Sequence, residues 1–145
     1  MPHSDPYLRR VEEIIAREGL TVQYVYASPD AGTRPFAYTI GLHTHPDRNY
    51  ELAVSGLNDR PSGVLLTTVA DILTTDPVEG LEIAGVLPDG YKLRLRRASR
   101  PHRLAIIQAL YDHIPSVWQV LWPDREHVFP DDENGHLVTE AQPLL

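Results

Sequence analysis

The spacing of apolar residues predicts a helix near the start of the chain. Between residues 6 and 18 they recur at helical intervals, and charged residues fill the positions between them. Asp5 stands where a helix N-cap is expected, and Gly19 stands where a left-handed C-cap is expected. We therefore predict a helix over residues 6–18.

The following segments have the composition of strands. Residues 21–27, 35–42 and 50–57 are rich in β-branched, aromatic and aliphatic side chains. Pro, Asp and Gly at residues 28–32 predict a turn, so we expect the first two strands to form a hairpin. The polar segment 43–49 contains a proline and is predicted to be a loop.

The second half of the chain continues with both kinds of element. We predict a helix over about residues 59–74, a hairpin of strands 81–87 and 91–97 around a Pro88-Asp89-Gly90 turn, a helix over residues 101–113, and a strand over residues 117–122. Residues 126–145 are expected to form a loosely structured tail. Strands and helices do not alternate strictly, so the order favours an α+β domain: one domain over residues 1–145, with two to three helices packed on an antiparallel or mixed sheet.

The amino-acid composition and net charge exclude several classes of function. The chain has 145 residues, of which 42% are hydrophobic, enough for one packed core. The absence of cysteine excludes a disulfide scaffold, a thiolate nucleophile and a cysteine metal site. The net charge of −7 argues against binding to nucleic acid or an anionic membrane. There is no apolar run long enough for a membrane span and no signal-like segment at Met1, so we expect a cytoplasmic protein.

Histidines cluster beside carboxylates after the second predicted strand. If the strand continues, His43 and His45 point to one side and, with a carboxylate, could hold a divalent transition metal. Without a metal, His45 could act as a general acid or base that Glu51 orients, and Tyr38 could supply a hydroxyl. The plainer alternative is a polar loop of hydrogen-bonded histidines and a Tyr38 that belongs to the sheet. These residues could also act without any cofactor.

The spacing of His113 indicates no function. With His102 it lies on the predicted helix 101–113, three turns away, a separation of about 16 Å that is too long for a shared metal ion.

Two further groups are candidate binding residues. Trp122 follows Trp118 by four positions, so both face one way in a strand, and Asp124 could orient a histidine or cap a turn. Arg94 and Arg96 alternate with apolar residues, which predicts a half-buried strand with a basic outer face. That face could bind an anion or simply be solvated.

Two blocks of sequence resemble a known family. The first is the run from Pro35 to Leu42, followed by His45-Pro46, Glu51-Leu52 and Gly56-Leu57. The second runs from Trp118 to Asp124, with Phe129-Pro130 and a final Gln142-Pro143-Leu144. Together they resemble the bacterial family known as domain of unknown function 4262. The resemblance implies a small, often stand-alone bacterial domain and implies no activity.

Two functions follow as expectations. The first is a binding or regulatory module, similar to an immunity protein or an antitoxin, whose acidic surface suits a basic partner. The alternative is a small enzyme, cofactor-independent or metal-assisted, that uses His–Glu acid–base chemistry. Convergence of the histidines in a pocket would favour the enzyme. The sequence specifies neither the protein partner or small ligand nor the oligomeric state.

Overall fold

The computed structural model describes residues 4–27, 33–73, 75–133 and 140–145, so the predicted turn at residues 28–32 lies outside the described residues. The described helices and strands follow in chain order: α1 (Pro6–Glu18), β1 (Thr21–Val25), β2 (Phe36–Ile40), the 3-10 turn η2 (Leu42–Thr44), β3 (Tyr50–Ser55), α2 (Asp59–Ile72), β4 (Glu82–Ile83), β5 (Leu93–Arg97), the 3-10 turn η3 (Pro101–Arg103), α3 (Ala105–Tyr111) and β6 (Ser116–Leu121). Among the described helices, none has the length and hydropathy needed to cross a membrane.

The six strands form one mixed sheet in the order β1-β2-β3-β6-β5-β4. β3 and β6 run parallel, with Tyr50 opposite Ser116 and Glu51 opposite Val117, and every other neighbouring pair is antiparallel. The predicted hairpin of the first two strands is confirmed, since Val25 pairs with Phe36. The α+β class with a mixed sheet and three helices is also confirmed.

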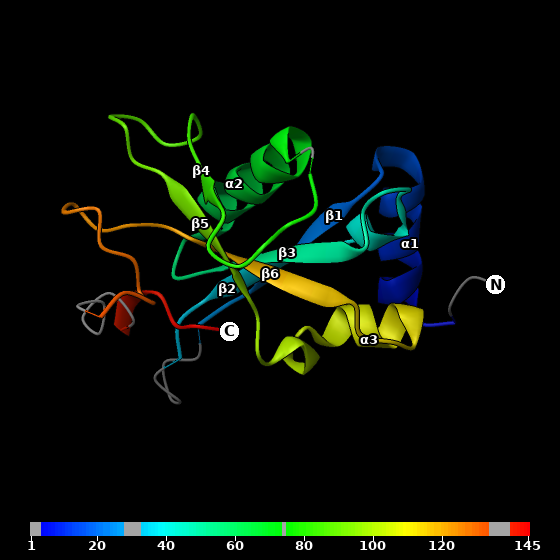
Figure 1. The fold of residues 1–145 in the computed structure, drawn as a ribbon. Helices are drawn as coiled ribbons and strands as arrows, with labels where there is room; N and C mark the ends of the chain where they lie inside the picture. The colour runs from blue at the N-terminus through cyan, green and yellow to red at the C-terminus, as the bar shows by residue number, and fades with distance from the viewer. Residues whose placement is uncertain (1–3, 28–32, 74, 134–139) are drawn as a thin grey trace.

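Helices cover both faces of the sheet (Figure 1). α2 packs Leu66 and Val69 on one face, together with Leu52 and Leu95 from the sheet. α1 and α3 pack on the opposite face, where Ile107 lies in a second apolar cluster. β3 is buried along its whole length because it lies between these layers at the centre of the sheet.

Several predicted boundaries change. Helices 6–18 and 59–74 are confirmed to within two residues, and the side chain of Asp5 caps α1 as predicted. The second hairpin keeps its turn at Pro88, but β4 spans only Glu82–Ile83 because Gly85 adopts a positive φ and ends the strand. The predicted helix 101–113 divides into η3 and the shorter α3.

The end of the chain is packed, which corrects the prediction of a loosely structured tail. Residues 140–145 run back along β3 and β6, where the Gln142 side chain bonds both backbone groups of Trp122. The Pro143 carbonyl accepts hydrogen bonds from Ser55 and Gln119, and Leu145 is 1% exposed. We call residues 140–145 the C-terminal strap.

Candidate functional site

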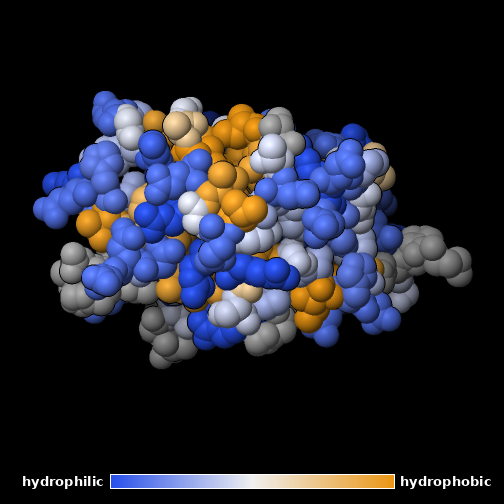
Figure 2. Space-filling view, viewed as in Figure 1, coloured by the Kyte–Doolittle hydropathy of each residue, from blue (hydrophilic) through white to orange (hydrophobic). Residues whose placement is uncertain are grey.

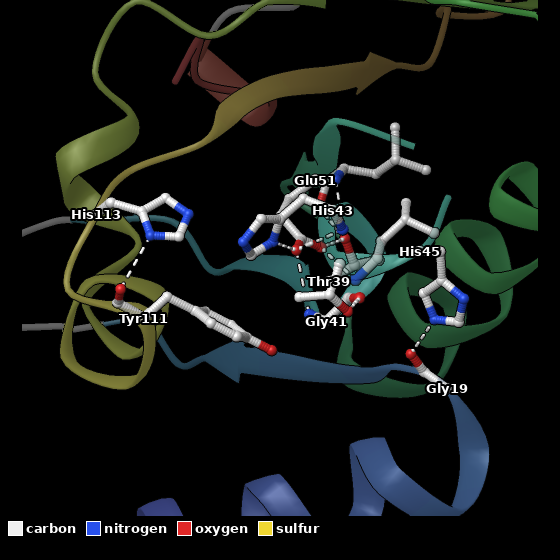
Figure 3. Close-up of polar contacts among 11 residues, drawn as sticks. Gly19, Thr39, Gly41, His43, His45, Glu51, Tyr111 and His113 are labelled. Carbon is white, nitrogen blue, oxygen red and sulfur yellow. Dashed lines mark hydrogen bonds and ion pairs between the residues drawn. The ribbon is translucent and has the colours of Figure 1, made fainter. Parts of the chain in front are cut away.

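A buried carboxylate organises one end of the central sheet (Figure 3). Glu51 lies on β3 and is fully buried. Its two oxygens accept hydrogen bonds from Thr39 Oγ1 at 2.7 Å and from the backbone N–H groups of Gly41, Leu42 and His43 at 3.1–3.2 Å. Every one of these partners is a donor, an arrangement that suits the ionised carboxylate.

Gly41 explains why the strand ends where it does. Its φ is +99°, and a Cβ at this position would lie 2.8 Å from Cγ2 of Ile15 on α1. The chain therefore leaves the sheet after β2 and enters η2, where successive N–H groups can converge on Glu51. The predicted loop over residues 43–49 is therefore confirmed, and the condition that the strand continues through His43 and His45 is not met.

His43 completes the cluster around Glu51. Its Nδ1 contacts Oε2 of Glu51, and because an ionised carboxylate only accepts, Nδ1 carries the proton in this pair. The side chain is 9% exposed, and Nε2 is buried with no hydrogen-bond partner among the described residues. The structure therefore presents a histidine held by a carboxylate at one nitrogen, with the other nitrogen available.

His45 points away from this cluster. Its Nε2 donates to the carbonyl of Gly19 at the end of α1, over 2.6 Å (Figure 3). Glu51 thus pairs with His43, and the predicted orientation of His45 by Glu51 is wrong. His45 joins its loop to the C-cap of α1, which is the plainer role of a hydrogen-bonded loop histidine.

The end of α3 and the segment after it bring two residues that the sequence did not single out. The ring of Tyr111 lies edge-on to the ring of His43, with centroids 4.6 Å apart, and the ring of His113 lies 5.2 Å from His43. His113 Nδ1 donates to the Tyr111 carbonyl over 2.9 Å. Burial is the main cause that raises the pKa of the Tyr111 phenol to about 12, and the nearby Glu51 carboxylate adds to it.

Parallel pairing explains this meeting. Tyr50 lies opposite Ser116, so the residues that precede β6 reach the same end of the sheet as Glu51 and the η2 turn. Local spacing gives no sign of this meeting, because Tyr111 and His113 follow His43 by 68 and 70 positions in the sequence.

Tyr38 lies elsewhere. It is 1% exposed in the core beneath α3, and its hydroxyl accepts a hydrogen bond from the N–H of Ile106 at 3.2 Å. Burial raises the pKa of this phenol to about 12. The contact supports the start of α3, so the structure places Tyr38 as a sheet residue and not beside the histidine loop.

The basic strand face is neutralised in part within the chain, at Arg94. Arg94 bonds Asp131 and Asp132 at 2.7–2.8 Å and Glu82 at 3.2 Å, and its guanidinium stacks on Phe129. These carboxylates raise the pKa of Arg94, and the Arg94 guanidinium in turn lowers the pKa of the Asp132 carboxyl. Arg96 is half-buried, and its Nη1 has no hydrogen-bond partner among the described residues.

Trp122 lines an apolar groove of about 470 Å³. We call it the Trp122 groove; its walls are Leu57, Leu65, Leu87, Pro88, Tyr91, Trp122, Pro123, Asp124 and Arg125. Trp118 and Trp122 share the α2 side of the sheet, as predicted. Asp124 Oδ1 accepts the N–H groups of Glu126 and Val128, so it caps the turn after β6.

The described residues hold no group of three or more histidine, aspartate or glutamate side chains arranged to bind a metal ion. His43 and His45 face different partners, so they do not form the pair that the sequence analysis considered. Nε2 of His43 is the imidazole nitrogen that is buried without a hydrogen-bond partner among the described residues.

Comparison with known proteins gives a family and nothing finer. Residues 14–135 match the family described as a domain of unknown function, DUF4262. No curated protein and no solved structure matches the chain significantly. The match covers most of the chain and includes the run from Pro35 to Leu42, Glu51 and Trp122. The chain therefore belongs to the family of domain of unknown function 4262.

Proposed function

We propose that the chain is a binding module that holds an apolar segment of a protein partner in the Trp122 groove and thereby regulates that partner, as immunity proteins and antitoxins do. The groove itself carries the proposal. On the face drawn in Figure 2, apolar side chains also gather over α2 and the neighbouring β4 region. Apolar grooves of this size are typical of binding sites.

Both aromatic polar groups in the groove walls are already bonded. Nε1 of Trp122 donates to the Ser55 carbonyl, and the hydroxyl of Tyr91 donates to the Arg125 carbonyl, each over 2.9 Å. An occupant therefore finds mainly apolar contact, and aromatic walls supply a large contact area. Side chains of a partner fit this chemistry better than a strongly polar metabolite does.

The charge of the chain favours a basic partner. The net charge is −7, and the basic strand face is offset by its own carboxylates, as at Arg94. Complementary charge speeds association and disfavours acidic competitors. We therefore expect a partner with a basic surface around an apolar side chain.

Two variants on one side of the molecule test the groove. Leu87 is half-buried in its wall, whereas Val64 is 60% exposed on α2 and does not line it. The experiment compares three tagged proteins: the parent, Leu87→Glu and Val64→Glu. Each is used to capture proteins from a lysate of the organism that encodes the chain. We expect a basic protein that the parent and Val64→Glu retain and Leu87→Glu loses. Identical captures, or none, would overturn the proposal.

A second candidate function rests on one observation. Glu51 holds His43 in a single orientation and leaves Nε2 free, which is the arrangement that acid–base or metal-assisted catalysis needs. A cavity of about 440 Å³ that His43 helps to line lies beside it, bordered also by His45, Asp47, Arg48, Asn49 and Asp76. The matching experiment measures loss of a substrate-dependent signal in His43→Gln, with His127→Gln, an exposed histidine outside this cavity, as the control. Equal signals in both variants would dismiss this candidate.

A further inference from the structure

We propose that His43 and His113 form a two-histidine site for a divalent transition metal, with zinc as its simplest occupant. The site is separate from the Trp122 groove. It replaces the pair of His43 and His45, which the fold directs to different partners.

The first argument is the state of the ring nitrogens. Nδ1 of His43 is held by the Glu51 carboxylate, and Nδ1 of His113 donates to the Tyr111 carbonyl. Histidines that bind metals usually give their other ring N–H to a carboxylate or a backbone carbonyl, which fixes the tautomer. Both imidazoles are thus set to offer the lone pair of Nε2.

The second argument is the position of the two rings. The His113 ring lies beside the His43 ring on the side away from Glu51 (Figure 3), and the ring centroids are 5.2 Å apart at an angle of 78°. Two imidazoles bound through Nε2 to one tetrahedral zinc ion, with Zn–N of about 2.0–2.1 Å, have centroids about 5.2 Å apart. The observed centroid separation matches this value.

The third argument is the unsatisfied nitrogen. Nε2 of His43 belongs to a side chain that is nine-tenths buried, and it has no partner among the described residues. A buried polar atom without a partner is costly, and a bound ion would remove that cost. His113 is exposed, so its side chain can turn outward to admit the ion while His43 stays fixed.

Two protein ligands leave coordination positions open. The described residues supply no third histidine or carboxylate to this site, so water or a donor atom of a bound molecule would complete it. Zinc and copper suit imidazole ligands, whereas magnesium and calcium prefer oxygen. The site therefore selects a transition metal over the abundant alkaline-earth ions.

The test is a calorimetric titration of zinc chloride into metal-stripped protein. His113→Ala removes an exposed ligand, and His45→Ala is the matched control because it removes a neighbouring exposed histidine outside the site. Loss of a supporting residue typically weakens metal binding about 10–100-fold, so loss of a ligand should weaken it at least about ten-fold. We expect that effect from His113→Ala and unchanged affinity in His45→Ala.

Three results would overturn the site. They are a parent protein that does not bind zinc, a His113→Ala variant that binds as tightly as the parent, and a His45→Ala variant that loses as much affinity as His113→Ala. Circular dichroism of each variant verifies that the fold persists. None of these results depends on the Trp122 groove, so the two proposals fail separately.

Discussion

Among single residues, Glu51 has the most consequences for the candidate site. One fully buried side chain gathers the donors of Thr39, of three consecutive backbone N–H groups and of His43. Such a carboxylate is stable only because every lone pair is used. It fixes both the path of the η2 turn and the orientation of His43.

Glu51→Gln should therefore destabilise the protein strongly. The amide keeps the shape but replaces one acceptor oxygen with a donor that faces other donors. Unpaired buried donors cost about 1–3 kcal/mol each, so we expect a loss of roughly 2–5 kcal/mol in urea unfolding. Glu13→Gln, on the exposed side of α1, is the control and should change stability by less than about 0.5 kcal/mol. Similar small losses in both variants would contradict the role of Glu51.

Tyr38 makes the stability of the folded protein depend on pH in the alkaline range. Burial raises the pKa of its phenol from 10.0 to about 12, so between these values the unfolded chain releases a proton that the folded chain keeps. The folded state then binds more protons, and the free energy of unfolding falls as pH rises, by up to about 1.4 kcal/mol per pH unit.

Tyr38→Phe should reduce that slope when unfolding is measured between pH 10 and pH 12. Tyr26→Phe is the control, because Tyr26 is 74% exposed. A parent protein whose stability does not change over this range would contradict the burial of the Tyr38 phenol.

At the level of single residues, the sequence identifies members of the site but not how they pair. His43 and Glu51 were both found, because they lie in one short segment rich in metal-binding and acid–base side chains. Their pairing does not follow from the sequence, because a positive φ at Gly41 turns the chain and directs His43 and His45 to different partners. A turn of this kind depends on contacts with Ile15, which are not local.

Among the elements, the C-terminal strap depends on one glycine. Gly56, at the end of β3, has a φ of +83°, and a Cβ there would lie 2.1 Å from the Ala141 carbonyl oxygen. The strap can pass this close only because the side chain is absent. This contact gives a physical reason for the Gly56-Leu57 pair within the resembling motif.

Gly56→Ala and Gly63→Ala should change stability in opposite directions. Gly56→Ala strains the backbone and displaces the strap, so we expect a loss of about 1–3 kcal/mol. Gly63 lies within α2, and a Cβ added there would meet no atom within 4 Å, so alanine should stabilise the helix by about 0.5–1 kcal/mol. Thermal unfolding measures both. A Gly56→Ala variant as stable as the parent would contradict the docked strap.

Elements with strong local signals were predicted well. α1 has a capping aspartate, a regular apolar stripe and a terminal glycine, and its observed bounds agree with the prediction. β4 and α3 are shorter than predicted because their ends are determined by neighbours, such as the Tyr38 hydroxyl at the N–H of Ile106. The strap was missed because its side chains bond to distant strands.

For the whole molecule, strand order decides which residues meet. The parallel pairing of β3 with β6 brings Tyr111 and His113 to Glu51, although neither strand sequence specifies its neighbour. The sequence predicted the class of fold and left the order of strands open. The order of the strands therefore determines which residues meet in the candidate site.

The charge of the whole chain yields a prediction about kinetics. If a net charge of −7 steers a basic partner, the association rate constant should fall as salt rises, because the Debye length shrinks from about 10 Å at 0.1 M to about 3 Å at 1 M. Dissociation from an apolar groove should change less. Stopped-flow mixing with the captured partner measures both, and a salt-independent association rate would refute electrostatic steering.

The most direct test of the site concerns the protons of His43. Both the second candidate function and the metal site require Glu51 to hold the Nδ1 proton and leave the lone pair on Nε2. Nitrogen-15 NMR of the imidazole rings at mildly alkaline pH reports which nitrogen is protonated. We predict that His43 carries its proton on Nδ1, which is seen as a one-bond coupling between that nitrogen and its proton. In Glu51→Gln this coupling should disappear. A proton found on Nε2 of His43 would contradict the account.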